Sequence, residues 1–128
     1  MRPPRTRARV ELLQWFGLLG GAAAWTCQHA TLFILGVARC NPAGSHWGAE
    51  IRGWQIGVTI GAAVVAGAAE AAAIATALRT REVEHEGPPP LGRIHFFALA
   101  ASAGNLLFLG AILLDGIGTT WWSPCGQG

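Results

Sequence analysis

Apolar residues gather in three long stretches that are separated by short polar and charged segments. Residues 12–38 and 94–114 contain no Asp, Glu, Lys or Arg, and residues 53–78 contain a single charged residue, Glu70. A helix rises ~1.5 Å per residue, so about 20 apolar residues cross a hydrocarbon core of ~30 Å. Inside lipid only a helix or a closed barrel satisfies every backbone group, and these stretches lack the alternation of barrel strands. The pattern predicts an all-α integral membrane protein with three transmembrane helices.

The arginines set the expected orientation of these helices. The sequence has no lysine, and seven of its nine arginines lie before the first stretch or between the second and the third. Because positive residues stay on the cytoplasmic side, we expect the N-terminus inside, the C-terminus outside, and helices that run up, down and up. The expected segments of this single membrane domain, residues 1–128, are helices at about 12–38, 53–79 and 93–116, an outer loop 39–52, an inner loop 80–92 and an outer tail 117–128.

The N-terminal region has a second interpretation, a cleaved secretory signal peptide, because arginines precede an apolar stretch and the small residues 22–24. The apolar character continues for fourteen residues beyond that point, which favours a retained helix. Arginines beside a membrane helix are explained by orientation and by contact with anionic lipid. We therefore expect no nucleic-acid partner.

Composition and motifs narrow the function classes. Charged residues make up 12% of the chain, about half of their share in a soluble domain. The connections between the apolar stretches are too short to hold a soluble domain. The sequence contains no nucleotide-binding, hydrolase or protease motif. We therefore do not expect an enzyme.

The second stretch carries the clearest signal for helix packing. Gly53, Gly57 and Gly61 recur every four residues and so lie on one face of a helix. Small residues let two membrane helices approach closely and gain dispersion contacts. This face is a candidate helix-packing or partner surface, which either another helix of the chain or a neighbouring subunit would occupy.

Two cysteines are expected at the same surface of the membrane. Cys40 follows the first stretch and Cys125 follows the third, so the predicted topology places both outside. In a bacterial inner membrane that surface faces the oxidising periplasm, and we expect a Cys40–Cys125 disulfide. The alternative is a metal site in which Cys40, His46 and Cys125 offer two thiolates and an imidazole to copper or zinc. Cys27, inside the first stretch, is expected to be a small buried residue.

Four polar residues of note lie inside the apolar stretches: Gln28, His29, Glu70 and Asn105. Each lies within roughly 10 Å of the centre of its stretch, so we expect one polar layer at the membrane midplane. Ionisable groups at this depth are usually paired inside a bundle or functional, and we expect a Glu70–His29 hydrogen bond. Three roles stay open for this layer: hydrogen bonding between helices, contact with a partner protein, and a proton path or ligand site.

The remaining ionisable residues do not indicate a cofactor. His29 and His95 are expected at heights that differ by roughly 20 Å, so the two cannot ligate one haem. We therefore expect no cofactor. Asp115, at the outer end of the third helix, is expected to pair with Arg39 or Arg52.

A set of residues spread over nearly the whole chain forms a recognisable pattern. The first helix carries Trp25 and His29, Cys40 follows it, and the chain ends with Leu-Leu-Asp-Gly-Ile-Gly at 113–118 and Ser-Pro-Cys at 123–125. This arrangement resembles a group of small bacterial three-helix proteins that are often encoded beside haem-copper terminal oxidases and their assembly factors. The resemblance implies a partner, a respiratory complex of the bacterial cytoplasmic membrane, and carries over no catalytic residue.

The sequence thus predicts a non-catalytic accessory subunit or assembly factor of a bacterial membrane respiratory complex, with a cytochrome oxidase as the first candidate. The protein would be a multi-pass protein of the inner membrane whose partners are lipid and the larger complex. One alternative is binding and delivery of copper at the periplasmic face through Cys40, His46 and Cys125. Another is a small oligomeric channel or transporter that uses Glu70.

Overall fold

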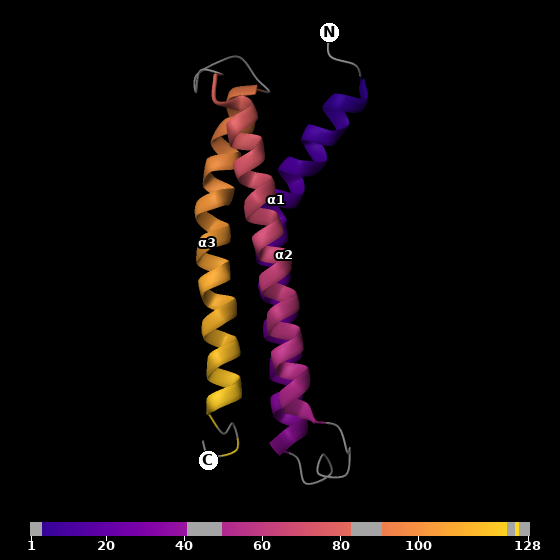
Figure 1. The fold of residues 1–128 in the computed structure, drawn as a ribbon, viewed down its shortest axis with the longest axis vertical. Coiled ribbons are helices and arrows are strands. Elements are labelled where there is room, and N and C mark those ends of the chain that lie inside the picture. Colours follow the sequence, from indigo (N-terminus) through magenta and orange to yellow (C-terminus); the bar gives the residue numbers. More distant parts are fainter. Residues whose placement is uncertain (1–3, 41–49, 83–90, 123–124, 126–128) are drawn as a thin grey trace.

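The computed structural model describes residues 4–40, 50–82, 91–122 and 125. Its helices are α1 (Pro4–Cys40), α2 (Ile51–Thr80) and α3 (Leu91–Trp121), as Figure 1 shows. Each contains a segment that is long and apolar enough to cross a membrane, namely Ala8–Cys40, Ile51–Thr80 and Gly92–Trp121. The prediction of three helices able to span a membrane is confirmed.

All three helices are longer than the sequence pattern indicates, at 37, 30 and 31 residues. α1 begins at Pro4, well before residue 12, because proline suits the first turn of a helix and arginine is a good helix former. α3 continues past residue 116 to Trp121. In its last turns Thr119 and Thr120 each donate a hydroxyl hydrogen bond of 2.8 Å to a carbonyl oxygen four residues earlier, which these residues can do without leaving the helix.

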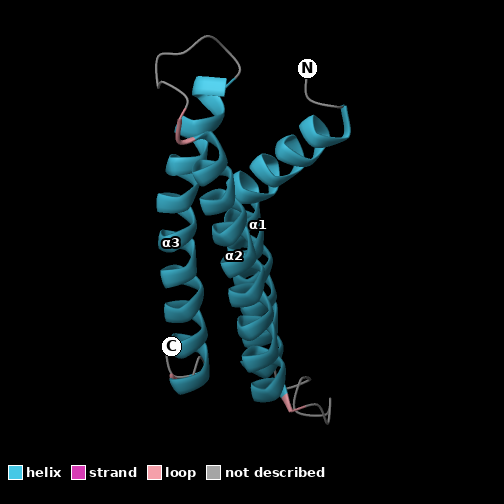
Figure 2. Ribbon diagram, turned by 45° about the horizontal axis from the view of Figure 1, so that its top comes forward, coloured by secondary structure: helices cyan, strands magenta, loops and turns pink. Residues whose placement is uncertain are grey.

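The helices pack as a bundle in which α2 runs antiparallel to both neighbours and α1 runs parallel to α3 (Figure 1). Every pair of helices is in contact. The first part of α1 leans away from the other two helices, which stay side by side (Figure 1 and Figure 2). The alternating direction of the helices agrees with the expected order, while the side of the membrane that each end faces stays a prediction.

Small residues make the closest contacts inside the bundle. A Cβ atom on Gly17 of α1 would lie 3.0 Å from the backbone nitrogen of Ala73 in α2, and one on Gly20 would lie 2.8 Å from the Cβ of Ala69. The buried apolar residues are Ala24, Leu32, Ala62, Ala66, Ala69, Ala72, Ala73, Ala98, Ala101 and Ile112. Close backbone approach of this kind lets membrane helices gain dispersion contacts, and it therefore contributes to holding the three helices together.

Large apolar side chains cover the outside of the bundle. Phe33, Val64, Leu107 and Leu114 are among those that are mostly exposed. Lipid tails are as apolar as leucine, so a membrane removes any drive to bury such side chains. Small residues inside and large apolar residues outside suit a bundle embedded in lipid.

Candidate functional site

The glycine face of α2, defined as Gly53, Gly57 and Gly61, points away from the bundle. It lies roughly 150° around α2 from buried Ala66 and Ala69, at about 100° per residue. A Cβ atom on Gly57 or on Gly61 would meet no atom within 4 Å. In the described part of the chain no helix covers this face, so its role as a partner surface stays a prediction.

A shallow hollow marks the N-terminal end of the glycine face. Its lining consists of Glu50, Gly53, Trp54, Gly57 and Val58. The two glycines leave room beside the exposed Trp54, and a Glu50 carboxylate oxygen lies 3.8 Å from the position of a Cβ on Gly53. The hollow therefore combines an apolar surface with one carboxylate, which suits a long side chain with a basic end.

The helices pack closely instead at glycines of α1, which the sequence analysis did not single out. Gly17, Gly20 and Gly21 face α2 and α3, and a Cβ on Gly21 would overlap the side-chain amide of Asn105. Their spacing of three and four residues places them on one helical face, which is a signal that the sequence does contain. A second contact of this kind joins Gly116 of α3 to Thr59 of α2.

The polar residues inside the bundle lie at separate levels, so the expectation of one midplane layer is wrong. Asn105 Nδ2 donates a 2.8 Å hydrogen bond to the carbonyl oxygen of Gly17. Gln28 makes its contacts eleven residues further along α1, a distance of roughly 16 Å. We estimated the level of each residue from its distance to the centre of its own stretch. Because neighbouring helices run in opposite directions, equal distances from those centres can correspond to different levels in the bundle.

Gln28 bridges all three helices near one of these levels. Its Nε2 donates to Thr59 Oγ1 of α2 at 3.2 Å and to the Ile112 carbonyl oxygen of α3 at 2.9 Å. Its Oε1 and the Oε1 of Gln55 are buried and accept no hydrogen bond in the described part of the chain. Gln28 thus makes the interhelical hydrogen bonds that a purely structural role requires, and leaves one acceptor free.

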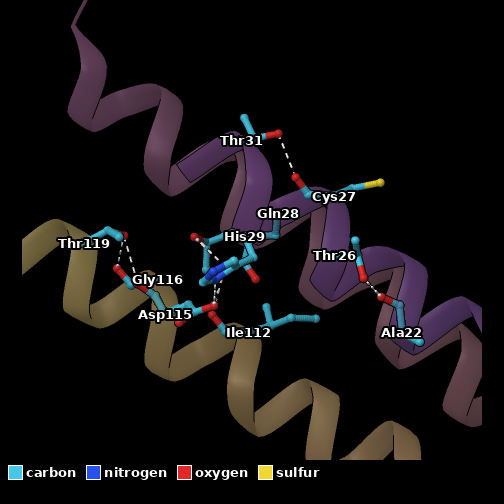
Figure 3. A network of polar contacts seen from close by, with 11 residues as sticks. Ala22, Thr26, Cys27, Gln28, His29, Thr31, Ile112, Asp115, Gly116 and Thr119 are labelled. Atoms are coloured by element: carbon cyan, nitrogen blue, oxygen red, sulfur yellow. Dashed lines mark hydrogen bonds and ion pairs between the residues drawn. The ribbon is translucent and has the colours of Figure 1, made fainter. Parts of the chain in front are cut away.

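His29 pairs with Asp115, which joins α1 to α3 (Figure 3). His29 Nδ1 and Asp115 Oδ2 are 2.9 Å apart, and their side chains are 59% and 32% exposed. The ring of Trp25 stacks on the imidazole, with centroids 5.4 Å apart, and lies beside Phe108 at 5.9 Å. Asp115 is therefore the partner of His29, and the expected pairing of Asp115 with an arginine is wrong.

Glu70 contacts a serine, so the expected Glu70–His29 hydrogen bond is wrong. Ser102 Oγ of α3 donates to Glu70 Oε1 at 2.5 Å. Glu70 Oε2 is buried and has no hydrogen-bond partner among the described residues. Serine is common in membrane helices, so the sequence gives no signal that Ser102 would contact the carboxyl group of Glu70.

A third polar contact lies at the opposite end of the bundle from His29. Thr80 Oγ1 of α2 and His95 Nδ1 of α3 are 2.9 Å apart, and both residues are buried. His95 precedes Asp115 by twenty residues of α3, which is roughly 30 Å. The two histidines therefore lie too far apart to act on one ligand.

The structure brings Cys40 and Cys125 together as a disulfide pair with Cα atoms 5.3 Å apart. This confirms the predicted proximity of two cysteines that are 85 residues apart in the sequence. His46, the third residue of the alternative metal site, lies outside the described residues. In the described residues no group of three His, Cys, Asp or Glu side chains is placed to hold a metal ion. Cys27 is a free, exposed cysteine, so the expectation that it is buried is wrong.

The chain matches no protein-family model, no curated protein and no solved structure.

Proposed function

We propose that this protein is a non-catalytic accessory subunit or assembly factor of a larger membrane protein complex, which it binds through the glycine face of α2. The observation that carries the proposal is the open space at Gly57 and Gly61, where no atom lies within 4 Å of an added Cβ. A partner helix can approach the α2 backbone there as closely as α1 does at Gly17 and Gly20.

The hollow at the end of this face supports the same proposal. A helix seated on the glycines would bring its own side chains over Gly53 and Trp54, beside the carboxylate of Glu50. An arginine or lysine at the partner's membrane boundary would pair with this carboxylate. The pair would fix the position of the partner helix along α2, since the glycines alone allow sliding.

The identity of the complex rests on the sequence resemblance. A respiratory complex of the bacterial inner membrane, with a cytochrome oxidase first, is the partner that the resemblance implies. Delivery of copper by Cys40 and Cys125 is the less favoured alternative, because both sulfur atoms are engaged with each other in the disulfide pair. A metal would bind them only after reduction.

The test is purification of the protein from its native membrane in mild detergent, comparing Gly57→Leu with Gly67→Leu. Gly67 is the control, because it is an exposed glycine of the same helix with no atom near an added Cβ. It lies about 80° around α2 from Gly57 and roughly 15 Å further along the helix. We expect Gly57→Leu to lower the yield of co-purified partner at least tenfold and Gly67→Leu to leave it unchanged. Haem bands and oxidase subunits in the same peak would support a respiratory partner. Equal retention of both variants, or a chain that purifies without any partner, would contradict the proposal.

A further inference from the structure

The pair formed by His29 and Asp115 occupies an unusual place for ionisable side chains. His29 lies ten residues, roughly 15 Å, along α1 from Arg39, and the exposed residues between them include Phe33, Ile34 and Val37. The pair is therefore set among lipid-facing apolar side chains. Ionisable groups at such a depth normally face the interior of a bundle, because exposure to lipid is costly. Yet 59% of the His29 side chain and 32% of the Asp115 side chain are exposed.

The pair also leaves half of its hydrogen-bonding capacity unused. The one contact joins His29 Nδ1 to Asp115 Oδ2, and Figure 3 shows it in the space between α1 and α3. Within the described residues, His29 Nε2 and Asp115 Oδ1 make no hydrogen bond. One patch of surface thus presents both an unused imidazole nitrogen and an unused carboxylate oxygen. Such a patch is complementary to itself.

We propose that a second copy of this chain covers the pair, in a twofold dimer formed through the surface between α1 and α3. The axis of such a dimer is normal to the membrane, and each copy presents the same patch to the other. His29 Nε2 of each copy would face Asp115 Oδ1 of the partner copy. Two imidazoles and two carboxyl groups would then form a closed ring of four hydrogen bonds that carries no net charge. Each of the four groups would then have a hydrogen-bond partner in the other copy, which lowers the cost of leaving these groups exposed to lipid.

The surface of α3 around Asp115 allows the close approach that this dimer requires. Gly104, Ala111 and Gly118 are spaced seven residues apart beside Asp115, and a Cβ on either glycine would meet no atom within 4 Å. A seven-residue repeat keeps one seam in contact between two helices that wind around each other with a left-handed twist. Copies that insert with the same orientation bring their α3 helices together in parallel, which is the arrangement that a twofold axis along the membrane normal gives. This surface is separate from the glycine face of α2, so a dimer leaves that face open.

The first test is cross-linking of the full chain in lipid vesicles, in a Cys27→Ser background that keeps the Cys40–Cys125 disulfide. A short bifunctional maleimide is applied to Ala111→Cys and, as a control, to Ile60→Cys. Ile60 is exposed on the outer side of α2 and lies at a similar level of the bundle. We expect a cross-linked dimer with Ala111→Cys and at least tenfold less with Ile60→Cys. Equal cross-linking of the two variants, or none with either, would overturn the proposal.

The second test asks whether the polar pair acts between copies. His29→Ala and Asp115→Ala chains with different tags are co-expressed. Pull-down from vesicles then compares mixed dimers, which contain one chain of each variant, with like dimers, which contain two chains of the same variant. Neither variant retains the pair within one copy, and like dimers of either variant have no cross-copy pair. A mixed dimer keeps one, between His29 of one copy and Asp115 of the other. We expect mixed dimers to exceed like dimers several-fold. An equal distribution would show that the pair acts only within one chain, and would overturn the proposal.

The proposal on the dimer and the proposed function fail in different ways. A chain that is monomeric alone, and whose Ala111→Cys variant cross-links to a subunit of a larger complex, would overturn the dimer while leaving the accessory function in place. A dimer that co-purifies with no other protein would support the interface and contradict the accessory function.

Discussion

Asn105 of α3 donates a 2.8 Å hydrogen bond to the carbonyl oxygen of Gly17 in α1, although 88 residues separate them. The amide reaches the α1 backbone because Gly21, one turn further on, has no side chain, and a Cβ there would overlap it. A backbone carbonyl oxygen has two lone pairs, so the Gly17 carbonyl can accept the Asn105 hydrogen bond in addition to the one within its own helix. Close packing and hydrogen bonding thus depend on the same glycine.

Gly21→Ala should therefore destabilise the bundle. The added methyl group forces the buried Asn105 side chain or the helix backbone to move, and overpacking of this kind costs about 1–3 kcal/mol. Gly61→Ala is the control, because an added Cβ there meets no atom within 4 Å. It should change stability by less than about 0.5 kcal/mol. Unfolding by sodium dodecyl sulfate in mixed micelles, followed by circular dichroism, measures both. Equal stability of the two variants would show that the α1–α3 contact is not close.

Two buried glutamines should differ in their response to replacement by leucine. Gln28→Leu removes hydrogen bonds to Thr59 and to the Ile112 carbonyl and should cost about 1–2 kcal/mol, within the range of interhelical bonds in membranes. Gln55→Leu removes a buried Oε1 that accepts no hydrogen bond in the described part of the chain, and should be neutral or stabilising. The same unfolding experiment distinguishes them. A larger loss for Gln55→Leu would indicate that its amide has a partner in the native membrane.

Features that depend on composition along the chain could be predicted from the sequence. Apolar stretches free of charge predict the number of helices and their approximate positions, and the alternation of helix directions follows from short connections. That alternation also brings the residues after the first and third helices to one end, which is why the Cys40–Cys125 proximity was predictable. Helix ends were less predictable, because a helix can continue into polar residues beyond an apolar stretch. This is why α1 begins as early as Pro4 and α3 ends as late as Trp121.

Features that depend on the rotation of each helix about its axis could not be predicted. Both α1 and α2 carry glycines at helical spacing, and in lipid an apolar residue is as favourable outside as inside. The sequence therefore does not tell whether Gly17 or Gly57 faces the core. The expected Glu70–His29 bond failed for a related reason. Each residue lies within roughly 7 Å of its stretch's centre, but in antiparallel helices the two displacements add to roughly 13 Å.

The Cys40–Cys125 disulfide leaves one free thiol in the chain, so the number of thiols that react with a maleimide tests whether the disulfide is present. Under non-reducing conditions a maleimide-linked polymer should shift the protein once, through the exposed Cys27, and three times after reduction. Removing a disulfide typically costs about 2–5 kcal/mol. Cys40→Ser and Cys125→Ser should lower stability by the same amount, and Cys27→Ser should not. Three modified thiols without reduction would show that the pair is not oxidised in the cell, and would reopen the metal-binding alternative.

The orientation in the membrane follows from the arginines and is tested at the end of the chain. With seven of the nine arginines on the predicted inner side, the C-terminus should face the periplasm in a bacterial host. Alkaline phosphatase fused after Gly128 should be active, whereas a fusion in the inner loop 80–92 should not. The reverse pattern would place the cysteine pair in the reducing cytosol, where a stable disulfide is not expected.

Replacement of Glu70 separates an accessory role from ion transport. Glu70→Gln keeps an oxygen to accept the hydrogen bond from Ser102, so the fold should be retained with a stability change below about 1 kcal/mol. Under the accessory role, proteoliposomes of the wild-type chain and of this variant should leak protons no faster than empty vesicles. Ser102→Ala is the matched control, because it removes the hydrogen bond and keeps the carboxyl group. Proton flux that is present in the wild type, survives Ser102→Ala and disappears in Glu70→Gln would assign transport to the buried carboxyl group and displace the accessory proposal.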